Sequence, residues 1–93
     1  MATVTVKFFA TVREITGMRS MEMEAKNIRE LLDRLKQQFG KPFIDVVIDP
    51  KTDELKKFFS CMVNGKRIEL LNSYETELAD NDAVALFPPV GGG

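Results

Sequence analysis

The stretch Asn27–Gly40, NIRELLDRLKQQFG, carries the clearest structural pattern in the chain. Asn27 can accept a hydrogen bond from a free backbone N–H of a helix start, and Glu30 can complete a capping box. Gly40 can adopt the left-handed conformation that caps a helix C-terminus, and Pro42 opposes continuation of the helix. The apolar residues follow helical spacing and form one stripe: Ile28, Leu31, Leu32, Leu35 and Phe39. We predict a helix over 28–39 with one face that must be buried.

Strand patterns precede this helix. Thr3–Phe9, TVTVKFF, places Val4, Val6 and Phe8 on one face and Phe9 on the other. Gly17 suggests a turn, after which Met18–Ala25 also alternates. We therefore predict two antiparallel strands before the helix.

Strand patterns also follow it. The apolar residues of 43–48 suggest a short buried strand before the turn-like residues 49–53. Phe58–Val63 and Lys66–Leu70 flank Asn64-Gly65, the strongest short hairpin signal. Asp80-Asn81-Asp82 marks a turn before a last strand, Ala83–Phe87, which ends where Pro88 cannot donate to a sheet.

This order of elements predicts an α+β domain over 1–87, with the helix packed across one face of a sheet, and a flexible tail over 88–93. The sheet then has a second face. Alternation can bring Phe9, Met62 and Phe87 together there, as an apolar patch for a partner. The alternative is that one or more of the three, Met62 above all, belongs to the core.

Composition limits the function. The 93 residues allow one domain with a modest core, and 44% hydrophobic with 29% charged residues is typical of a globular protein. Thirteen Lys and Arg against 14 Asp and Glu give a net charge of −1, which favours neither nucleic acid nor a membrane surface as partner. No apolar stretch is long enough to span a membrane, and the N-terminal residues lack the features of a secretory signal. We therefore expect a cytoplasmic protein.

Familiar catalytic groups are missing from the sequence. Histidine is absent, and Cys61 has no histidine that could generate its thiolate, so a small buried hydrophobe is the better interpretation. Acid pairs such as Asp80 and Asp82 have no Cys or His cluster beside them, so we expect no metal site. No glycine-rich loop leads into a helix, as a phosphate cradle would need.

The sequence ends on FPPVGGG, Phe87–Gly93. Gly91 and Gly92 have no side chain and can enter a narrow channel, while Pro88 and Pro89 favour an extended path and Val90 offers one apolar anchor. The α-carboxylate of Gly93 could be activated by adenylation. Taken alone, such an ending is more often a frayed end or a cloning remnant.

Several stretches together resemble the MoaD/ThiS family of ubiquitin-like sulfur carriers, and within it the MoaD branch. They cover most of the chain: VKFFATVREITG at Val6–Gly17, NIRELLDRL at Asn27–Leu35, MVNGKRI at Met62–Ile68 and LADNDAVALFPPVGGG at Leu78–Gly93.

The resemblance implies a β-grasp fold and a carrier whose catalysis is supplied by partners. An adenylating enzyme of the MoeB/ThiF type, related to ubiquitin-activating enzymes, would use ATP and magnesium to adenylate Gly93. A sulfur donor would then displace AMP and leave a thiocarboxylate. In molybdopterin synthase, a large subunit of the MoaE type would receive the tail and the sulfur. The chain itself would bind no cofactor.

Two departures from the family pattern leave the pathway open. The segment 41–57 is longer than in the shortest family members and resembles archaeal and other MoaD-like proteins, some of which also serve as ubiquitin-like protein modifiers. The ending has Gly91 where the family has a different residue before Gly-Gly. A ubiquitin-like modifier joined to substrate lysines through Gly93, or a carrier for thiazole synthesis, therefore remains as an alternative.

Overall fold

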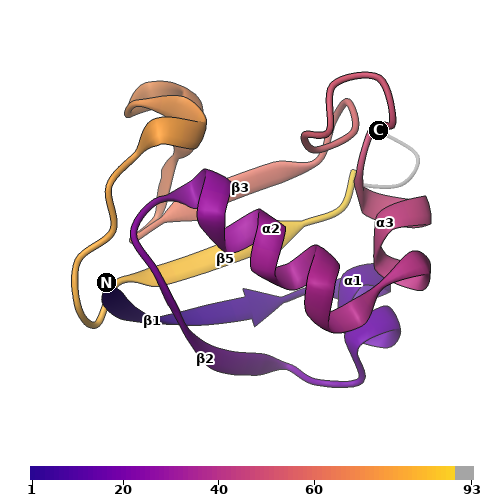
Figure 1. Cartoon of the computed structure of the whole chain (residues 1–93), viewed down its shortest axis with the longest axis horizontal. Coiled ribbons are helices and arrows are strands. Elements are labelled where there is room, and N and C mark those ends of the chain that lie inside the picture. The colour runs from indigo at the N-terminus through magenta and orange to yellow at the C-terminus, as the bar shows by residue number, and fades with distance from the viewer. Residues whose placement is uncertain (90–93) are drawn as a thin grey trace.

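A mixed sheet with the strand order β2-β1-β5-β3-β4 organises residues 1–89, the part of the chain that this computed structural model describes (Figure 1). The central pair, β1 and β5, is parallel, and the other neighbours are antiparallel. The strands are β1 (Ala2–Phe8), β2 (Ser20–Ala25), β3 (Ser60–Val63), β4 (Lys66–Arg67) and β5 (Ala83–Phe87).

Helix α2 (Ile28–Phe39) crosses one face of this sheet, with the bounds that the sequence predicts (Figure 1). The Asn27 side chain accepts from the backbone N–H of Glu30 at 2.8 Å. The Glu30 carboxylate accepts in turn from Lys26 N–H, also at 2.8 Å, one residue earlier than an ideal capping box requires. Together, these two hydrogen bonds fix where the helix begins.

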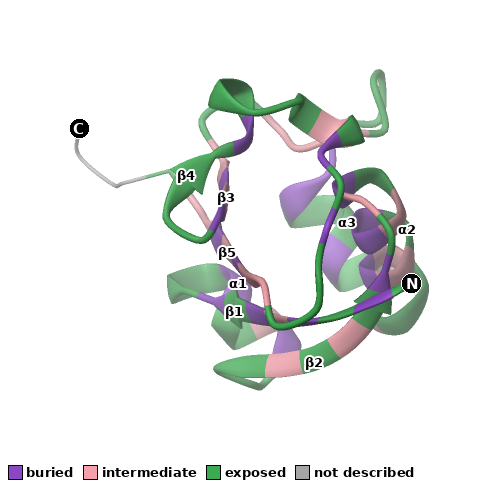
Figure 2. Ribbon diagram, turned by 90° about the vertical axis from the view of Figure 1, so that its left-hand side faces the viewer, coloured by how far each residue is buried: buried purple, intermediate pink, exposed green. Residues whose placement is uncertain are grey.

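The core lies between α2 and the sheet, and Figure 2 shows buried residues on the facing sides of both layers. Ile28, Leu31, Leu32 and Leu35 are buried on the helix. Val4, Val6 and Phe8 are buried on β1, while Thr3 and Lys7 are exposed on its other face. The α+β prediction and the β-grasp fold implied by the resemblance are confirmed by this arrangement. The boundary between 87 and 88 stays a prediction.

The strand predicted over 43–48 is wrong, because Lys41–Val47 forms helix α3. Phe43 and Val47, four residues apart, are both buried, whereas Ile44 and Val46 are at least 37% exposed. Gly40 separates α2 from α3 with a φ of 66°, which a glycine adopts without strain, and Pro42 lies in the first turn of α3. Pro42 thus opposes continuation of α2 and is tolerated in the first turn of α3.

A further helix, α1 (Ala10–Thr16), occupies the segment that we expected only to turn. It buries only Val12 and Thr16, which is too few residues to produce a clear apolar stripe in the sequence. Gly17 ends α1 in the left-handed conformation, with a φ of 74°, and donates its N–H to Arg13. The second strand therefore begins at Ser20 and not at Met18.

The hairpin after β3 forms as predicted but is shorter. Asn64 and Gly65 both have positive φ, as a two-residue hairpin turn requires. β3 begins at Ser60, two residues later than expected, and β4 has two residues. Residues 68–70 form a 3-10 turn that buries Ile68, and a second 3-10 turn covers Ser73–Glu75. None of the described helices is long and apolar enough to cross a membrane.

Cys61 belongs to the core on β3, with 1% of its surface exposed. Burial, with a smaller contribution from the charge of Glu69, raises the pKa of its thiol from 9.0 to about 12. A thiol with this pKa stays protonated at neutral pH and is a poor nucleophile. The interpretation of Cys61 as a small buried hydrophobe fits this environment.

We expect Leu35→Ala to lower the free energy of unfolding by about 2–5 kcal/mol, because Leu35 is fully buried against the sheet. Gln38→Ala, at an exposed position of the same helix, is the control and should change it by less than about 0.5 kcal/mol. Urea unfolding followed by circular dichroism measures both. Equal effects would show that α2 does not pack as described.

We also expect the stability contributed by Cys61 to fall as pH rises from about 9 to about 12. In this window the folded state keeps a proton that the unfolded state releases, so raising the pH favours unfolding. The difference in unfolding free energy between wild type and Cys61→Ala should shrink by about 1.4 kcal/mol per pH unit. Burial is the largest cause that raises the pKa of Tyr74 and is common to both proteins, whereas the charge of Cys61 makes only a smaller contribution to that shift. A pH-independent difference would contradict the buried, protonated thiol.

Candidate functional site: an apolar groove at the end of β5

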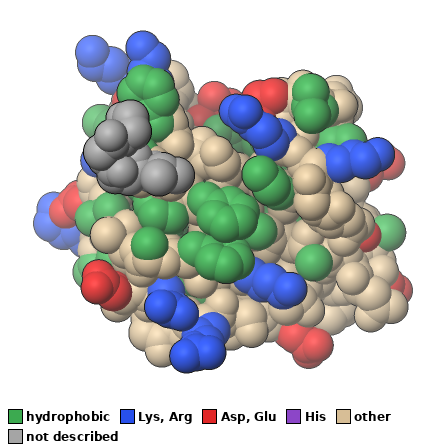
Figure 3. Space-filling model, turned by 180° about the vertical axis from the view of Figure 1, so that it is seen from behind, with side chains coloured by type: hydrophobic (Ala, Val, Ile, Leu, Met, Phe, Trp, Pro, Cys, Tyr) green, Lys and Arg blue, Asp and Glu red, His purple; other side chains and the backbone are tan. Residues whose placement is uncertain are grey.

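An apolar groove of about 510 Å³ lies where β5 ends. It belongs to the sheet face that α2 leaves uncovered, and Figure 3 shows hydrophobic side chains in the middle of that face with Lys and Arg side chains around them. The groove is lined by Phe9, Ala10, Phe58, Ser60, Met62, Phe87, Pro88 and Pro89.

The rings of Phe9 and Phe87 stack in this groove, with centroids 4.3 Å apart and planes inclined by 13°. Phe9 directly follows β1 and has extended backbone, so its side chain points opposite to that of buried Phe8. Phe87 is the last residue of β5, which runs parallel to β1. The parallel pairing therefore brings the ends of both strands, and these two rings, to the same edge of the sheet.

Met62 joins them from β3. It pairs with Ala85 of β5, while Ser60 pairs with Phe87. Its side chain is half-buried in the groove wall, and its neighbours Cys61 and Val63 are buried in the core. The structure thus brings the three predicted patch residues, Phe9, Met62 and Phe87, to one surface; their role in partner binding stays a prediction.

Phe58 extends the groove and was missed as a patch residue. It is 77% exposed, and its φ of 73° is in the left-handed region that non-glycine residues seldom adopt. Ala10, on the opposite rim, has a φ of 52°. Phe58 lies in the loop before β3, so the two-residue alternation along that strand does not place it, and the sequence offers no periodic signal for its position. Two positive φ values beside one groove are the kind of local strain that gathers at functional sites.

Pro88 and Pro89 continue from β5 and line the groove. Of the predicted tail, these two prolines lie within the described residues, whereas Val90, Gly91, Gly92 and Gly93 lie outside them. Four residues follow Pro89 in the sequence. A fully extended chain covers at most roughly 3.6 Å per residue, so any group that reacts with Gly93 must lie within about 14 Å of Pro89.

Two cationic side chains lie on the open face of the sheet, on either side of Ala85 and Met62. The strand register forms one row across the open face, from Lys7 through Ala85 and Met62 to Arg67. Lys7 and Arg67 are exposed at its two ends. A complementary surface would therefore place an apolar group at the centre and acidic side chains at the rim.

Two acidic residues outside the groove, Asp80 and Asp82, have structural roles. Asp80 accepts from the backbone N–H of Thr3 at 2.9 Å, and Asp82 accepts from Asn64 and Ala79 at 2.9 and 2.8 Å. These bonds fasten the turn before β5 to β1 and to the β3–β4 hairpin. No group of three or more metal-ligating side chains is found within residues 1–89.

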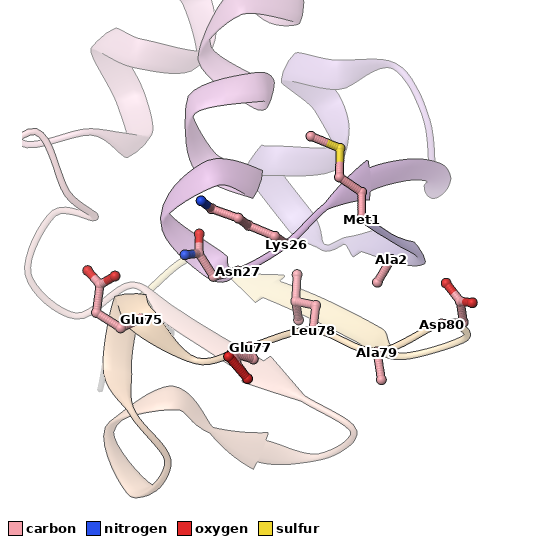
Figure 4. A pocket seen from close by; sticks show the side chains of 9 residues that line it. All are labelled: Met1, Ala2, Lys26, Asn27, Glu75, Glu77, Leu78, Ala79 and Asp80. Atoms are coloured by element: carbon pink, nitrogen blue, oxygen red, sulfur yellow. The ribbon is translucent and has the colours of Figure 1, made fainter.

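A second hollow, of about 660 Å³, lies at the start of β1, at the far end of that strand from Phe9. Its lining mixes Lys26 with Glu75, Glu77 and Asp80, and Figure 4 shows the three carboxylates pointing in different directions. This hollow is polar, and the carboxylates do not converge on one point. It offers no arrangement suited to general acid and base catalysis.

Comparison with known proteins agrees with the fold. The ThiS family matches residues 6–93. Small archaeal modifier protein 3 of Haloferax volcanii is 32% identical, over 95% of this chain and 96% of that protein. A putative sulfur carrier protein of Archaeoglobus fulgidus is 30% identical, over 83% of this chain and 85% of that protein.

Solved structures give the same result. Small archaeal modifier protein 1 of Methanosarcina acetivorans superimposes with a TM-score of 0.84 at 30% identity, covering 100% of this chain and 98% of that one. A putative molybdopterin converting factor, subunit 1, of Pyrococcus furiosus has a TM-score of 0.75 at 29% identity, covering 97% and 100%.

One related structure is an assembly. A chain of the BexX/CysO complex of Amycolatopsis orientalis has a TM-score of 0.79 at 25% identity, covering 97% of this chain and 99% of that one. A protein with this fold is thus found in complex with a different protein. Fold, family match and near full-length similarity together show that this chain belongs to the ThiS/MoaD family of ubiquitin-like sulfur carriers and modifiers.

Proposed function

We propose that this chain is a sulfur carrier for molybdenum cofactor biosynthesis, acting as the small subunit of a molybdopterin synthase. The observation that carries the proposal is the position of the groove. Its wall includes Pro88 and Pro89, the residues that lead from β5 to the terminal glycines. A partner bound to Phe9, Met62 and Phe87 would therefore be in reach of Gly93.

The chemistry would take place at the α-carboxylate of Gly93. A carboxylate is a poor electrophile, so it first attacks the α-phosphate of ATP, releasing pyrophosphate and forming an acyl-adenylate. A sulfur donor then displaces AMP to give the thiocarboxylate, which passes sulfur to a pterin precursor. Gly91 and Gly92 suit this role because the absence of Cβ lets them pass through a narrow channel.

The catalytic groups would come from partners. Cys61 is buried and protonated, and Asp80 and Asp82 are engaged in backbone and side-chain hydrogen bonds. We propose a MoeB/ThiF-type enzyme that brings ATP and magnesium, a sulfur donor, and a MoaE-type large subunit that receives the tail. Because the proposed activation would consume ATP, we also propose a cytoplasmic location.

A protein modifier is the second candidate, and the names of the Haloferax and Methanosarcina relatives favour it to a comparable degree. The same acyl-adenylate would then be captured by a substrate lysine as an isopeptide. A carrier for thiazole synthesis is a third, with the same activation step. All three use the groove and Gly93 alike and differ in the final acceptor.

Intact mass spectrometry tests the proposal after incubation with a MoeB-type enzyme, ATP, magnesium and a sulfur donor. We expect the mass gain of one oxygen replaced by sulfur, located on Gly93 by fragmentation, and molybdopterin formation when a MoaE-type subunit is added. A variant lacking Gly92 and Gly93 is the control and should show neither. An unchanged carboxylate, with the enzyme active on another carrier, would refute the carrier role.

Conjugation in cells separates the two leading candidates. If the chain is only a carrier, blots of cell extract should show no ladder of higher-mass species, because no lysine captures Gly93. A ladder that disappears on deletion of Gly92 and Gly93 would instead identify a modifier.

We expect Phe87→Asp to weaken binding to the activating enzyme at least about tenfold, because it puts an unpaired charge in the apolar groove. Leu70→Asp is the matched control, since Leu70 is a 77% exposed hydrophobic residue outside the groove. Calorimetry measures binding, and circular dichroism checks folding. If Phe87→Asp unfolds the chain, Phe58→Asp repeats the test at a 77% exposed groove residue. Binding unchanged by a folded groove variant would remove the groove from the interface.

A further inference from the structure

Strand β2 leaves one edge of the sheet unpaired within residues 1–89, and Figures 1 and 2 both show it at the margin. Phe8 N–H donates to Arg19 at 2.8 Å, and hydrogen-bonded pairs alternate along an antiparallel ladder. The register then directs the backbone groups of Met21 and Met23 toward β1. Those of Ser20, Glu22 and Glu24 point outward, where no other described segment bonds to them.

A groove of about 410 Å³ runs beside this edge, between β2 and α2. Met21 and Met23 contribute apolar surface to it, because they lie opposite Val6 and Val4 on the helix side of the sheet and are only half-buried. The wall on α2 consists of Arg34, Gln37 and Gln38. An extended backbone along β2 would therefore have room for its inward side chains.

Arg34 gives a second, independent sign of a missing partner. Its Nε is buried, and no hydrogen-bond partner for it is found within residues 1–89. Its Nη2 makes only a 3.5 Å contact with the sulfur of Met1. A buried donor without an acceptor costs free energy. Because Arg34 lines the groove, a rotation of its side chain would let an acceptor on a bound segment pair with the guanidinium.

The charges on β2 decide the nature of the segment. Glu22 and Glu24 alternate with the methionines along β2, are exposed, and also contribute to the lining of the groove. Two copies of this chain paired edge to edge would bring these carboxylates next to one another, and like charges on neighbouring strands are destabilising. On an added strand, Lys or Arg directly opposite Glu22 and Glu24 would be stabilising, because opposite charges on neighbouring strands attract. A basic segment of another protein therefore fits better than a second copy of this chain.

We propose that β2 binds an extended segment of another protein as an added strand, in which apolar residues alternate with Lys or Arg. About six residues would match the six of β2. The apolar side chains enter the groove beside Met21 and Met23, the basic ones lie opposite Glu22 and Glu24, and the segment supplies an acceptor to Arg34. This site is separate from the groove at the end of β5, because Met21 and Met23 lie on the helix side of the sheet and the two grooves share no lining residue. Both sites can be occupied at once.

The test uses the full chain labelled with ¹⁵N and an acetylated, amidated peptide of alternating valine and lysine, seven residues long. Addition of the peptide should slow hydrogen exchange of the outward amides of Glu22 and Glu24. The amides of Met21 and Met23, already bonded to β1, should change little, and Met62 should not change. A matched peptide of alternating valine and glutamate is the control and should bind at least about threefold more weakly.

A charge reversal completes the test. Glu22→Lys should weaken binding of the valine–lysine peptide by about three- to tenfold. The control Glu14→Lys carries the same charge change on an exposed residue of α1 and should leave binding unchanged. The proposal is wrong if Glu22 and Glu24 gain no protection, if both peptides bind equally, or if protection appears on raising the protein concentration alone, which would indicate pairing between copies. Each outcome leaves the sulfur-carrier test with Gly93 unaffected.

Discussion

The parallel pairing of β1 with β5 is the constraint on which the rest of the structure depends. Parallel neighbours cannot be joined by a tight turn, so the chain must leave the sheet and return, and α2 is the element that covers the sheet on the way. The same pairing makes both strands end at one edge. Phe9 and Phe87, the residues at those ends, stack with ring centroids 4.3 Å apart. They line the groove together with Pro88 and Pro89, which directly follow Phe87 in the sequence.

Coverage of the sheet by helices on one side explains why a small domain exposes large apolar groups. Side chains alternate between the two faces of β5, so Val84 and Leu86 are buried while Ala83, Ala85 and Phe87 face outward. Within residues 1–89, no second layer of helices covers this face of the sheet. Hence the groove is a consequence of the fold, whereas its cationic flanks depend on the sequence: Lys7 lies at one end of the row, and Arg67, ion-paired with Glu69 at 3.6 Å, lies at the other.

The sequence was most informative where one local rule acted alone. The α2 stripe, the Asn64-Gly65 turn and the alternation of β1 each follow from spacing or from a positive φ, and each is found where predicted. It was least informative for α1 and α3, each of seven residues, where only two residues are buried. For Phe43–Ile48 the high content of branched residues favoured a strand, but packing of Phe43 and Val47 against the core favoured a helix. The outward position of Phe9 could be derived from alternation, whereas Phe58 is placed by a loop conformation that no periodic pattern encodes.

The loop before β3 connects the part of the chain that departs from the family pattern to the groove at the end of β5. Residues 49–57 are held on α2 by ion pairs of Lys36 with Asp53 at 3.0 Å and of Arg29 with Glu54 at 3.3 Å, and Leu55 N–H donates to the Tyr74 hydroxyl at 3.2 Å. Each of these ion pairs has at least one exposed partner and contributes little to stability by itself. Together with the Tyr74 hydrogen bond, they hold residues 53–55 against the rest of the domain. The loop ends at Phe58, the most exposed aromatic residue of the groove. The proposed chemistry at Gly93 would be the same in a carrier and in a modifier, so selection between partners would depend on surface features that vary. Phe58, which directly follows the segment 41–57, is such a feature, because it lines the same groove as Pro88 and Pro89.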